Sequence, residues 1–271
     1  MSANPFLDRA LVHDDLYGSA ARLAHRTQAL HQAKISGRDV AATIADLLAA
    51  RIPPDAVVLD IGCGRGTTAL HLATRLRPHR LVAVDASAAL LTATRDRLDE
   101  ASATASVVRA DFHHLPLPSR LADAAVAAFC LYHSPTPTAA VAEIARCLRP
   151  GGTAVLVTKS LDSYAELDHL VHAAGLDPDV SRRPSLYESF HSGNLREIAA
   201  TSLTVLDVRH EEHAFRFADA AHLAQYLATT PKYRIAPAGG AVALAAILRQ
   251  QLPAPPYTAR STVSVALAVR R

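Results

Sequence analysis

The feature of this sequence that most restricts its fold is a short apolar run that leads into a glycine-rich turn and then an amphipathic segment. The run 57–61 is apolar except at Asp60, as expected of a parallel strand covered on both faces. The turn alternates glycine with larger residues, at Gly62, Gly64 and Gly66. Glycine lets the backbone bend sharply and lets a ligand approach it closely. A glycine turn between a buried strand and a helix is the usual nucleotide-binding element of a doubly wound α/β sheet.

The spacing of the three glycines separates the possible ligands of this turn. A dinucleotide-binding turn, G-x-G-x-x-G, would need its third glycine at Thr67, and a phosphate-binding P-loop would need a lysine that is absent. The remaining pattern, D-x-G-x-G-x-G from Asp60 to Gly66, resembles motif I of the class I S-adenosylmethionine (SAM) dependent methyltransferases. The resemblance implies that SAM is the cofactor, that the glycine turn lies under its amino-acid part, and that Asp60 reaches its ammonium group.

Two acidic residues follow the next two apolar runs. Asp85 ends the run 81–85 and lies 23 positions after Gly62. A carboxylate at the end of a second strand can accept hydrogen bonds from both ribose hydroxyls, with Ala86 beside it at the cofactor. The alternative is that Asp85 caps the following helix. Asp111 ends the third run, and the resemblance implies that it accepts from the adenine amino group. The neighbouring Phe112 either covers the adenine or packs in the core.

Further elements of the same resemblance follow in order. The fourth apolar run, 122–130, ends in Phe129, a candidate cofactor contact, and continues into a Leu-Tyr-His turn similar to that of many small-molecule methyltransferases. The segment 143–153, which ends in R-P-G-G-T, is similar to the family's signature before the fifth strand. The matches cover about residues 57–158. They imply a doubly wound, seven-stranded, mostly parallel Rossmann-like sheet with helical lid insertions.

We expect three regions along the chain. Residues 1–50 form an N-terminal helical cap, residues 51–159 form the SAM-binding core, and residues 160–271 supply the remaining strands with inserted lid helices. The segments 160–193 and 218–260 are interpreted as the insertions. In the resembled family such a cap folds over the cofactor, which makes Tyr17 a candidate cofactor contact and Arg26 a candidate pocket residue. Ordinary packing and surface charge are the alternative for both.

The candidate catalytic residues lie in the turn after the fourth strand. His133 is the first candidate for a general base, because a histidine can accept a proton at neutral pH and this turn should lie near the transferred methyl group. The alternative is that a backbone hydrogen bond to His133 orients the loop. Tyr132 is a weaker candidate that could equally form the pocket wall. The aromatic residues of the insertions either frame a cyclic acceptor or pack the lid: Tyr187, Phe190, Tyr226 and Tyr233.

Composition excludes several classes of function. Lys and Arg number 28 and Asp and Glu 25, so the net charge of +3 is too small to indicate nucleic-acid binding. No run of about 18 apolar residues and no charged-apolar leader is present, so neither a membrane span nor a signal peptide is predicted. The three cysteines have no C-x-x-C spacing. They favour a reducing cytoplasm and give no indication of a metal site.

The predicted function is transfer of a methyl group from SAM to a small-molecule acceptor, in bacterial secondary metabolism as the alanine and arginine bias suggests. One alternative keeps the fold and changes the chemistry to cyclisation, elimination or intramolecular displacement. A second alternative is a non-catalytic SAM-binding partner subunit. We expect a monomer or homodimer, or a complex with a partner protein. The lid segments do not identify the acceptor or the atom that is methylated.

Overall fold

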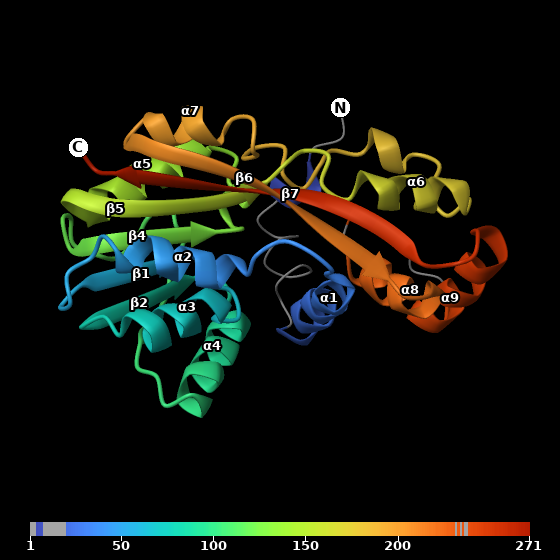
Figure 1. Ribbon diagram of the computed structural model, residues 1–271, viewed down its shortest axis with the longest axis horizontal. Helices are drawn as coiled ribbons and strands as arrows, with labels where there is room; N and C mark the ends of the chain where they lie inside the picture. The colour runs from blue at the N-terminus through green and yellow to red at the C-terminus, as the bar shows by residue number, and fades with distance from the viewer. Residues whose placement is uncertain (1–3, 8–19, 231, 234, 236–237) are drawn as a thin grey trace.

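A seven-stranded sheet forms the centre of the computed structural model, which describes residues 4–7, 20–230, 232–233, 235 and 238–271 (Figure 1). The strand order is β3-β2-β1-β4-β5-β7-β6. The strands are β1 (Val57–Ile61), β2 (Arg80–Asp85), β3 (Ser106–Arg109), β4 (Ala122–Ala128), β5 (Leu148–Lys159), β6 (Thr204–Phe217) and β7 (Tyr257–Val269). The first five strands pair in parallel, and β7 is antiparallel to both β5 and β6. The predicted fold class is confirmed.

Helices cover both faces of the sheet because alternate strand residues point to opposite sides. Leu59 and Ile61 pack with α5 and α7 on one face, whereas Val58 packs with α2, α3 and α4 on the other. The helical elements are η1 (Pro5–Leu7), α1 (Ala20–Ala33), α2 (Val40–Ala49), α3 (Thr67–His71), η3 (Leu72–Leu76), α4 (Ala88–Glu100), η4 (Leu131–His133), α5 (Pro137–Cys147), α6 (Ala165–Ala173), η5 (Val180–Arg182), α7 (Leu195–Ala200), α8 (Ala220–Thr229) and α9 (Gly240–Gln251).

The register of the parallel strands brings their carboxyl ends to one edge of the sheet. Ile61 of β1 lies opposite Val84 of β2 on one side and Ala127 of β4 on the other. The connections that follow these strands therefore all leave the sheet at this edge. This alignment places the glycine turn, the acid after β2 and the turn after β4 around a common space.

The last two strands, which are connected through α8 and α9, form a long antiparallel pair that reaches beyond the rest of the sheet (Figure 1). Its register runs from Thr204 opposite Val269 to Phe217 opposite Tyr257. The sequence analysis ended the second insertion at residue 260, but β7 already begins at Tyr257, so that boundary was wrong. Strand β7 starts earlier because Tyr257, Ala259 and Ser261 continue its alternating buried pattern.

A second hydrophobic cluster, the lid cluster, lies at the far end of this strand pair. It consists of buried residues from α1, α6, α8, α9 and the adjoining ends of β6 and β7. Helix α1 joins it through Ala29 and Ala33, and His222 Nε2 of α8 donates to the Ala29 carbonyl oxygen at 2.8 Å. Helix α2 instead packs on the sheet. The two helices expected in the N-terminal cap thus belong to different cores.

No helix in the described part of the chain is long and apolar enough to cross a membrane.

Candidate active site

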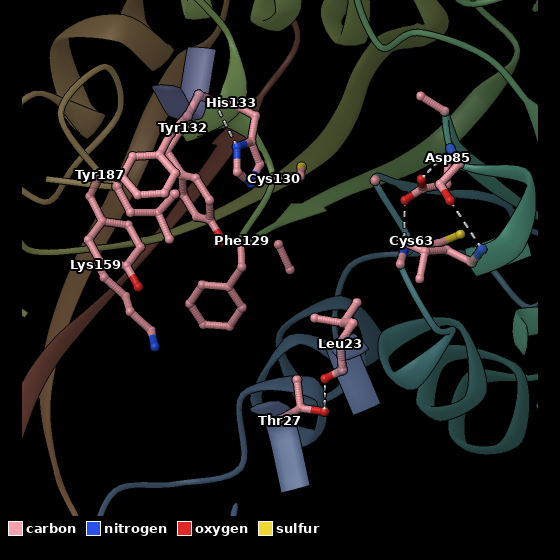
Figure 2. A pocket seen from close by; sticks show the side chains of 18 of the residues that line it. Leu23, Thr27, Cys63, Asp85, Phe129, Cys130, Tyr132, His133, Lys159 and Tyr187 are labelled. Atoms are coloured by element: carbon pink, nitrogen blue, oxygen red, sulfur yellow. Dashed lines mark hydrogen bonds between the residues drawn. The ribbon is translucent and has the colours of Figure 1, made fainter. Parts of the chain in front are cut away.

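A cavity of about 610 Å³ extends along the carboxyl edge of the sheet. Figure 2 shows Cys63 and Asp85 on one side of the view and Phe129, Lys159 and Tyr187 on the other. The first group belongs to the turns after β1 and β2. The second group comes from the turn after β4, the end of β5 and the segment that follows α6. The cavity is therefore one space whose two ends differ in chemistry: main chain and acids at one end, aromatic rings and an amine at the other.

The glycines of the turn after β1 differ in what surrounds them. All three glycines have left-handed φ angles, +66° at Gly62, +57° at Gly64 and +76° at Gly66, a region that favours glycine. A Cβ at Gly62 would lie 2.5 Å from the Cβ of Cys130, so this position must be bare for the turn to pack on β4. A Cβ at Gly64 would meet nothing within 4 Å, and Gly64 borders the cavity. The Cα side of Gly64 is thus open to a ligand, while its backbone N–H and carbonyl oxygen are bonded to Asp85 and Thr94.

Asp60 lies beneath this turn and does not border the cavity. It is 1% exposed, accepts a hydrogen bond from the backbone of Ala69, and its Oδ2 has no hydrogen-bond partner. Burial, and secondly the charge of Asp85, raise the pKa of Asp60 to about 8. An incompletely partnered buried carboxyl group under an open glycine turn fits a cationic group bound above it. The predicted contact with the SAM ammonium group remains a prediction.

Asp85 ties the end of β2 to the glycine turn. Its Oδ2 accepts from the backbone N–H of Gly64 and its Oδ1 from that of Ser87, both at 2.9 Å. The helix cap considered for Asp85 is provided instead by Ser87, whose hydroxyl accepts from the backbone of Leu90. Asp85 and its neighbour Ala86 both border the cavity.

Asp111 takes part in a hydrogen-bonded array that the sequence analysis missed. Its Oδ1 accepts from the backbone N–H of His113 at 2.9 Å and lies 2.7 Å from that residue's Nδ1. His113 Nε2 lies 2.7 Å from the hydroxyl of Ser134, which is fully buried after β4. The array fixes the turn after β3 against the turn after β4. Asp111, Phe112 and His113 all border the cavity, and the contact of Asp111 and Phe112 with adenine remains a prediction.

The two candidate catalytic residues also border the cavity. His133 Nδ1 donates to the carbonyl oxygen of Phe6 at 3.1 Å, the backbone bond that the sequence analysis gave as its alternative role. The Tyr132 ring packs edge-on against Tyr187, with ring centroids 5.0 Å apart, and its carbonyl oxygen accepts from Ser189. Both residues are thus held firmly in the wall. Their catalytic role remains a prediction.

The other predicted site residues divide into three groups. Arg26, Phe129, Tyr187, Tyr226 and Tyr233 border the cavity, whereas Phe190 is fully buried in the core beside β5. Tyr17 lies outside the described residues. Gly66 is not part of the cavity wall, and a Cβ there would lie 2.9 Å from Thr94.

The sequence analysis overlooked Lys159, the last residue of β5, which borders the cavity among aromatic rings. Burial lowers the pKa of its amine. A sequence signal did exist, since a charged residue directly follows a buried apolar strand whose carboxyl end faces the site.

This sheet order, with a glycine turn after β1 and acids after β2 and β3, defines the class I SAM-dependent methyltransferase fold. Residues 58–152 match a family described as a methyltransferase domain, which is the region that resembles the class I SAM-dependent methyltransferases in sequence. Within the described residues, no group of three or more His, Cys, Asp or Glu side chains could hold a metal ion.

Individual proteins similar to the chain agree with this family. A malonyl-[acyl-carrier protein] O-methyltransferase of Enterobacter lignolyticus is 33% identical over 166 residues, which are 59% of this chain and 63% of the relative. The YcgJ protein of Bacillus subtilis superposes with a TM-score of 0.59 at 17% identity, covering 84% of this chain and 97% of that one. The [4+2]-cyclase SpnF superposes with a TM-score of 0.54 at 20% identity, covering 87% of this chain and 84% of that one. At these identities the two solved structures support the fold alone.

The chain spans 30% to 63% of the length of four curated relatives that it matches.

Proposed function

We propose that the protein transfers a methyl group from SAM to a small-molecule acceptor. The observation that carries this proposal is the single cavity, which joins the glycine turn and its acids to an aromatic chamber. The chamber consists of Phe129, Tyr132, Tyr164, Tyr187, Tyr226 and Tyr233. A SAM-binding wall and a separate enclosed space are what methyl transfer to a small acceptor requires.

The residues present fit SAM in the order that the family resemblance implies. The open Cα side of Gly64 and the buried carboxyl of Asp60 suit the amino-acid part, Asp85 and Ala86 suit the ribose, and Asp111 and Phe112 suit the adenine. When bound, SAM supplies a methyl group that its sulfonium makes electrophilic. The chain's part is to exclude water and align the acceptor, and alignment alone can contribute roughly 7–11 kcal/mol to lowering a barrier.

The class of acceptor is inferred from the chamber and from the relatives. The chamber is lined by rings and by few charged groups, which suits an apolar or cyclic molecule. A relative named for malonyl-[acyl-carrier protein] supports a biosynthetic acceptor. We also propose a bacterial biosynthetic pathway, a cytoplasmic location and a monomer or homodimer. The described cysteines are all free, which suits a reducing compartment.

Titration calorimetry of the purified protein with SAM tests this proposal first. We expect one SAM bound per chain and competition by S-adenosylhomocysteine. A protein that takes up neither molecule would contradict the proposal. Incubation with SAM and candidate acceptors then separates the reactions, because methyl transfer yields S-adenosylhomocysteine in step with product. Product formed without S-adenosylhomocysteine would instead support cyclisation, elimination or displacement on the same fold.

A further inference from the structure

Lysine is rare in this chain, and two of its lysines, Lys159 and Lys232, border the cavity. Of the 28 basic residues only three are lysines: Lys34, Lys159 and Lys232. Lys34 Nζ donates to the carbonyl oxygen of Arg38, and Lys232 forms an ion pair with Asp168. Lys159 also borders the cavity, at the carboxyl end of β5, and differs from both because aromatic rings surround its amine. Arginine remains charged at all physiological pH values, whereas a buried lysine can lose its proton.

Aromatic groups surround the amine of Lys159. Its Nζ is 4.6 Å from the ring centroid of Tyr164, 5.3 Å from that of Phe129 and 6.0 Å from that of Tyr187. It donates a hydrogen bond to the Tyr164 hydroxyl. Among the ion pairs of the described residues, none includes Lys159. The ammonium form thus lacks the carboxylate partner that a structural buried lysine ordinarily has.

Burial favours the neutral form of Lys159, and the charged and titratable groups around it act in both directions. Burial is the main cause of the lowered pKa of Lys159, and the guanidinium of Arg26 on α1 adds to it, while the Tyr187 hydroxyl acts in the opposite direction. Lys34 and His213 also lie within electrostatic reach. Burial raises the pKa of Tyr164 and of Tyr187, so both hydroxyls stay protonated at neutral pH. Of the Lys159 amine and these two hydroxyl groups, the amine is therefore the one that can receive a proton.

We propose that Lys159 is the general base for a hydroxyl group on an aromatic acceptor bound in the tyrosine-lined chamber. This inference rests on the proposed function. The lone pair of Lys159 Nζ takes the hydroxyl proton as the O–H bond breaks. The acceptor oxygen then bonds to the methyl carbon as the carbon–sulfur bond breaks, which leaves a methyl ether, S-adenosylhomocysteine and an ammonium on Lys159 that returns its proton to solvent.

The chemistry of the chamber selects an aromatic hydroxyl. The six rings of the chamber offer stacking and edge contacts to a planar molecule. A phenolic hydroxyl is much more acidic than an aliphatic one, and proton transfer is efficient when donor and acceptor have similar pKa values. The new oxyanion would lie beside the ammonium of Lys159 and near the guanidinium of Arg26, which stabilise it.

Nuclear magnetic resonance tests the protonation of Lys159 directly, without turnover. Protein labelled with ¹³C-lysine and loaded with S-adenosylhomocysteine should show three Cε resonances. The Lys159→Met variant identifies one of them by its loss. We expect that resonance to titrate below the ordinary lysine value of about 10.4. A Lys159 resonance that titrates at or above that value would overturn the proposal.

The acidic phenol 4-nitrophenol tests proton transfer in the same complex, because its phenolate absorbs visible light and its neutral form does not. We expect the loaded wild-type protein to raise the phenolate absorbance above that of free 4-nitrophenol at the same pH. Lys159→Met should abolish the increase, and Lys34→Met, outside the cavity, should preserve it. No increase with the wild type, or an increase that survives in Lys159→Met but is lost in His133→Ala, would overturn the assignment.

Calorimetry with SAM separates failure of this inference from failure of the proposed function. Equal SAM affinity in the wild type and in Lys159→Met, combined with an ordinary Lys159 titration, would remove only the base. Absence of SAM binding by the wild type would remove the proposed function, whatever the titration of Lys159.

Discussion

Asp60 and Asp85 lie on either side of the same glycine turn, yet their surroundings give them opposite properties. Asp85 accepts two backbone hydrogen bonds, which stabilise a carboxylate. Asp60 has one such bond and a buried oxygen without a partner. A carboxyl group in that environment holds its proton. The turn therefore lies between an acid that borders the cavity and a buried acid whose pKa is raised.

The pH dependence of stability should reveal the protonation of Asp60. Its carboxyl group has a pKa near 3.8 when unfolded and about 8 when folded, so the folded state binds the extra proton. Below pH 4 the proton on Asp60 contributes fully to the free energy of unfolding. As the pH rises towards 8, the free energy of unfolding falls by up to about 1.4 kcal/mol per pH unit. Asp60→Asn, which is neutral, should remove that loss. Urea unfolding at several pH values measures it, and parallel curves for the two proteins would show that Asp60 is ionised when folded.

Asp85→Asn tests the predicted ribose contact with almost no change in shape. Hydrogen bonds to a charged group are worth about 1.5–3 kcal/mol, so the affinity for SAM should fall by roughly ten- to a hundredfold. Calorimetry gives the affinity, and thermal unfolding shows whether the fold is intact. Unchanged affinity for SAM in a folded variant would rule out the contact. The exposed Asp99→Asn on α4 is a control of the same chemistry.

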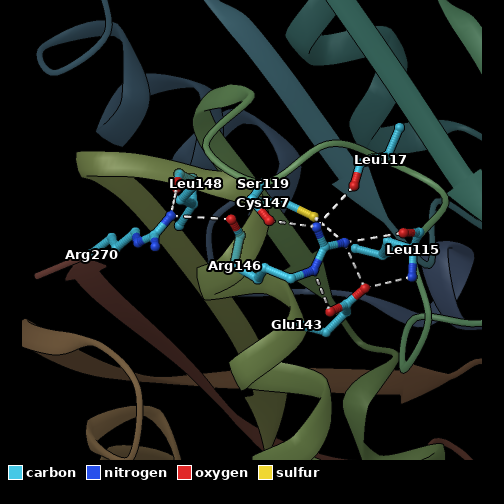
Figure 3. A network of polar contacts seen from close by, with 8 residues as sticks. All are labelled: Leu115, Leu117, Ser119, Glu143, Arg146, Cys147, Leu148 and Arg270. Carbon is cyan, nitrogen blue, oxygen red and sulfur yellow. Dashed lines mark hydrogen bonds and ion pairs between the residues drawn. The ribbon is translucent and has the colours of Figure 1, made fainter.

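At the scale of elements, Arg146 shows what the segment before β5 does in the structure (Figure 3). This segment is the one that resembles the family signature. Its guanidinium forms two bonds with Glu143, at 2.7 and 2.8 Å, and donates to the carbonyl oxygens of Leu115 and Leu117. Glu143 in turn accepts from the backbone of Leu115. One helical turn of α5 thus fixes the connection between β3 and β4, part of which borders the cavity.

Arg146→Ala should therefore lower stability more than loss of an ordinary surface arginine. The change leaves two carbonyl oxygens and a largely covered Glu143 without their partner, and we expect a loss of about 1–3 kcal/mol in the free energy of unfolding. Arg182→Ala is the control, because Arg182 pairs with Asp179 at 3.4 Å in solvent and should contribute little. Equal effects of the two substitutions in urea unfolding would show that the network is not stabilising.

The sequence predicted the elements whose signals are local. Strand β1 has the predicted limits 57–61, because its apolar run and the glycine turn after it are visible in the chain itself. The missed features depend on residues brought together by folding. The bond between His113 and Ser134 joins two turns, α1 packs on α8 across 193 positions of sequence, and the aromatic surroundings of Lys159 come from three separate loops.

For the whole molecule, helix α1 connects the two halves of the site. It packs on α8 of the lid cluster through its Ala29 carbonyl, and Thr27 lies 3.5 Å from the guanidinium of Arg65 in the glycine turn. Leu23, Arg26 and Leu30 of the same helix border the cavity. In Figure 1, α1 is drawn in the space between the sheet and the α8–α9 pair. Ligand binding at the glycine turn should therefore also stabilise this helix against local opening.

Hydrogen exchange with and without S-adenosylhomocysteine tests that connection. We expect backbone amides of the glycine turn and of α1 to exchange about tenfold more slowly in the complex, the effect of roughly 1.4 kcal/mol in local opening. Helix α9 is the internal control, because it belongs to the lid cluster but none of its residues borders the cavity. Equal slowing in α9 would mean uniform stabilisation by the ligand. Slowing confined to the glycine turn would show that α1 belongs to the lid alone and that the two ends of the cavity bind their ligands independently.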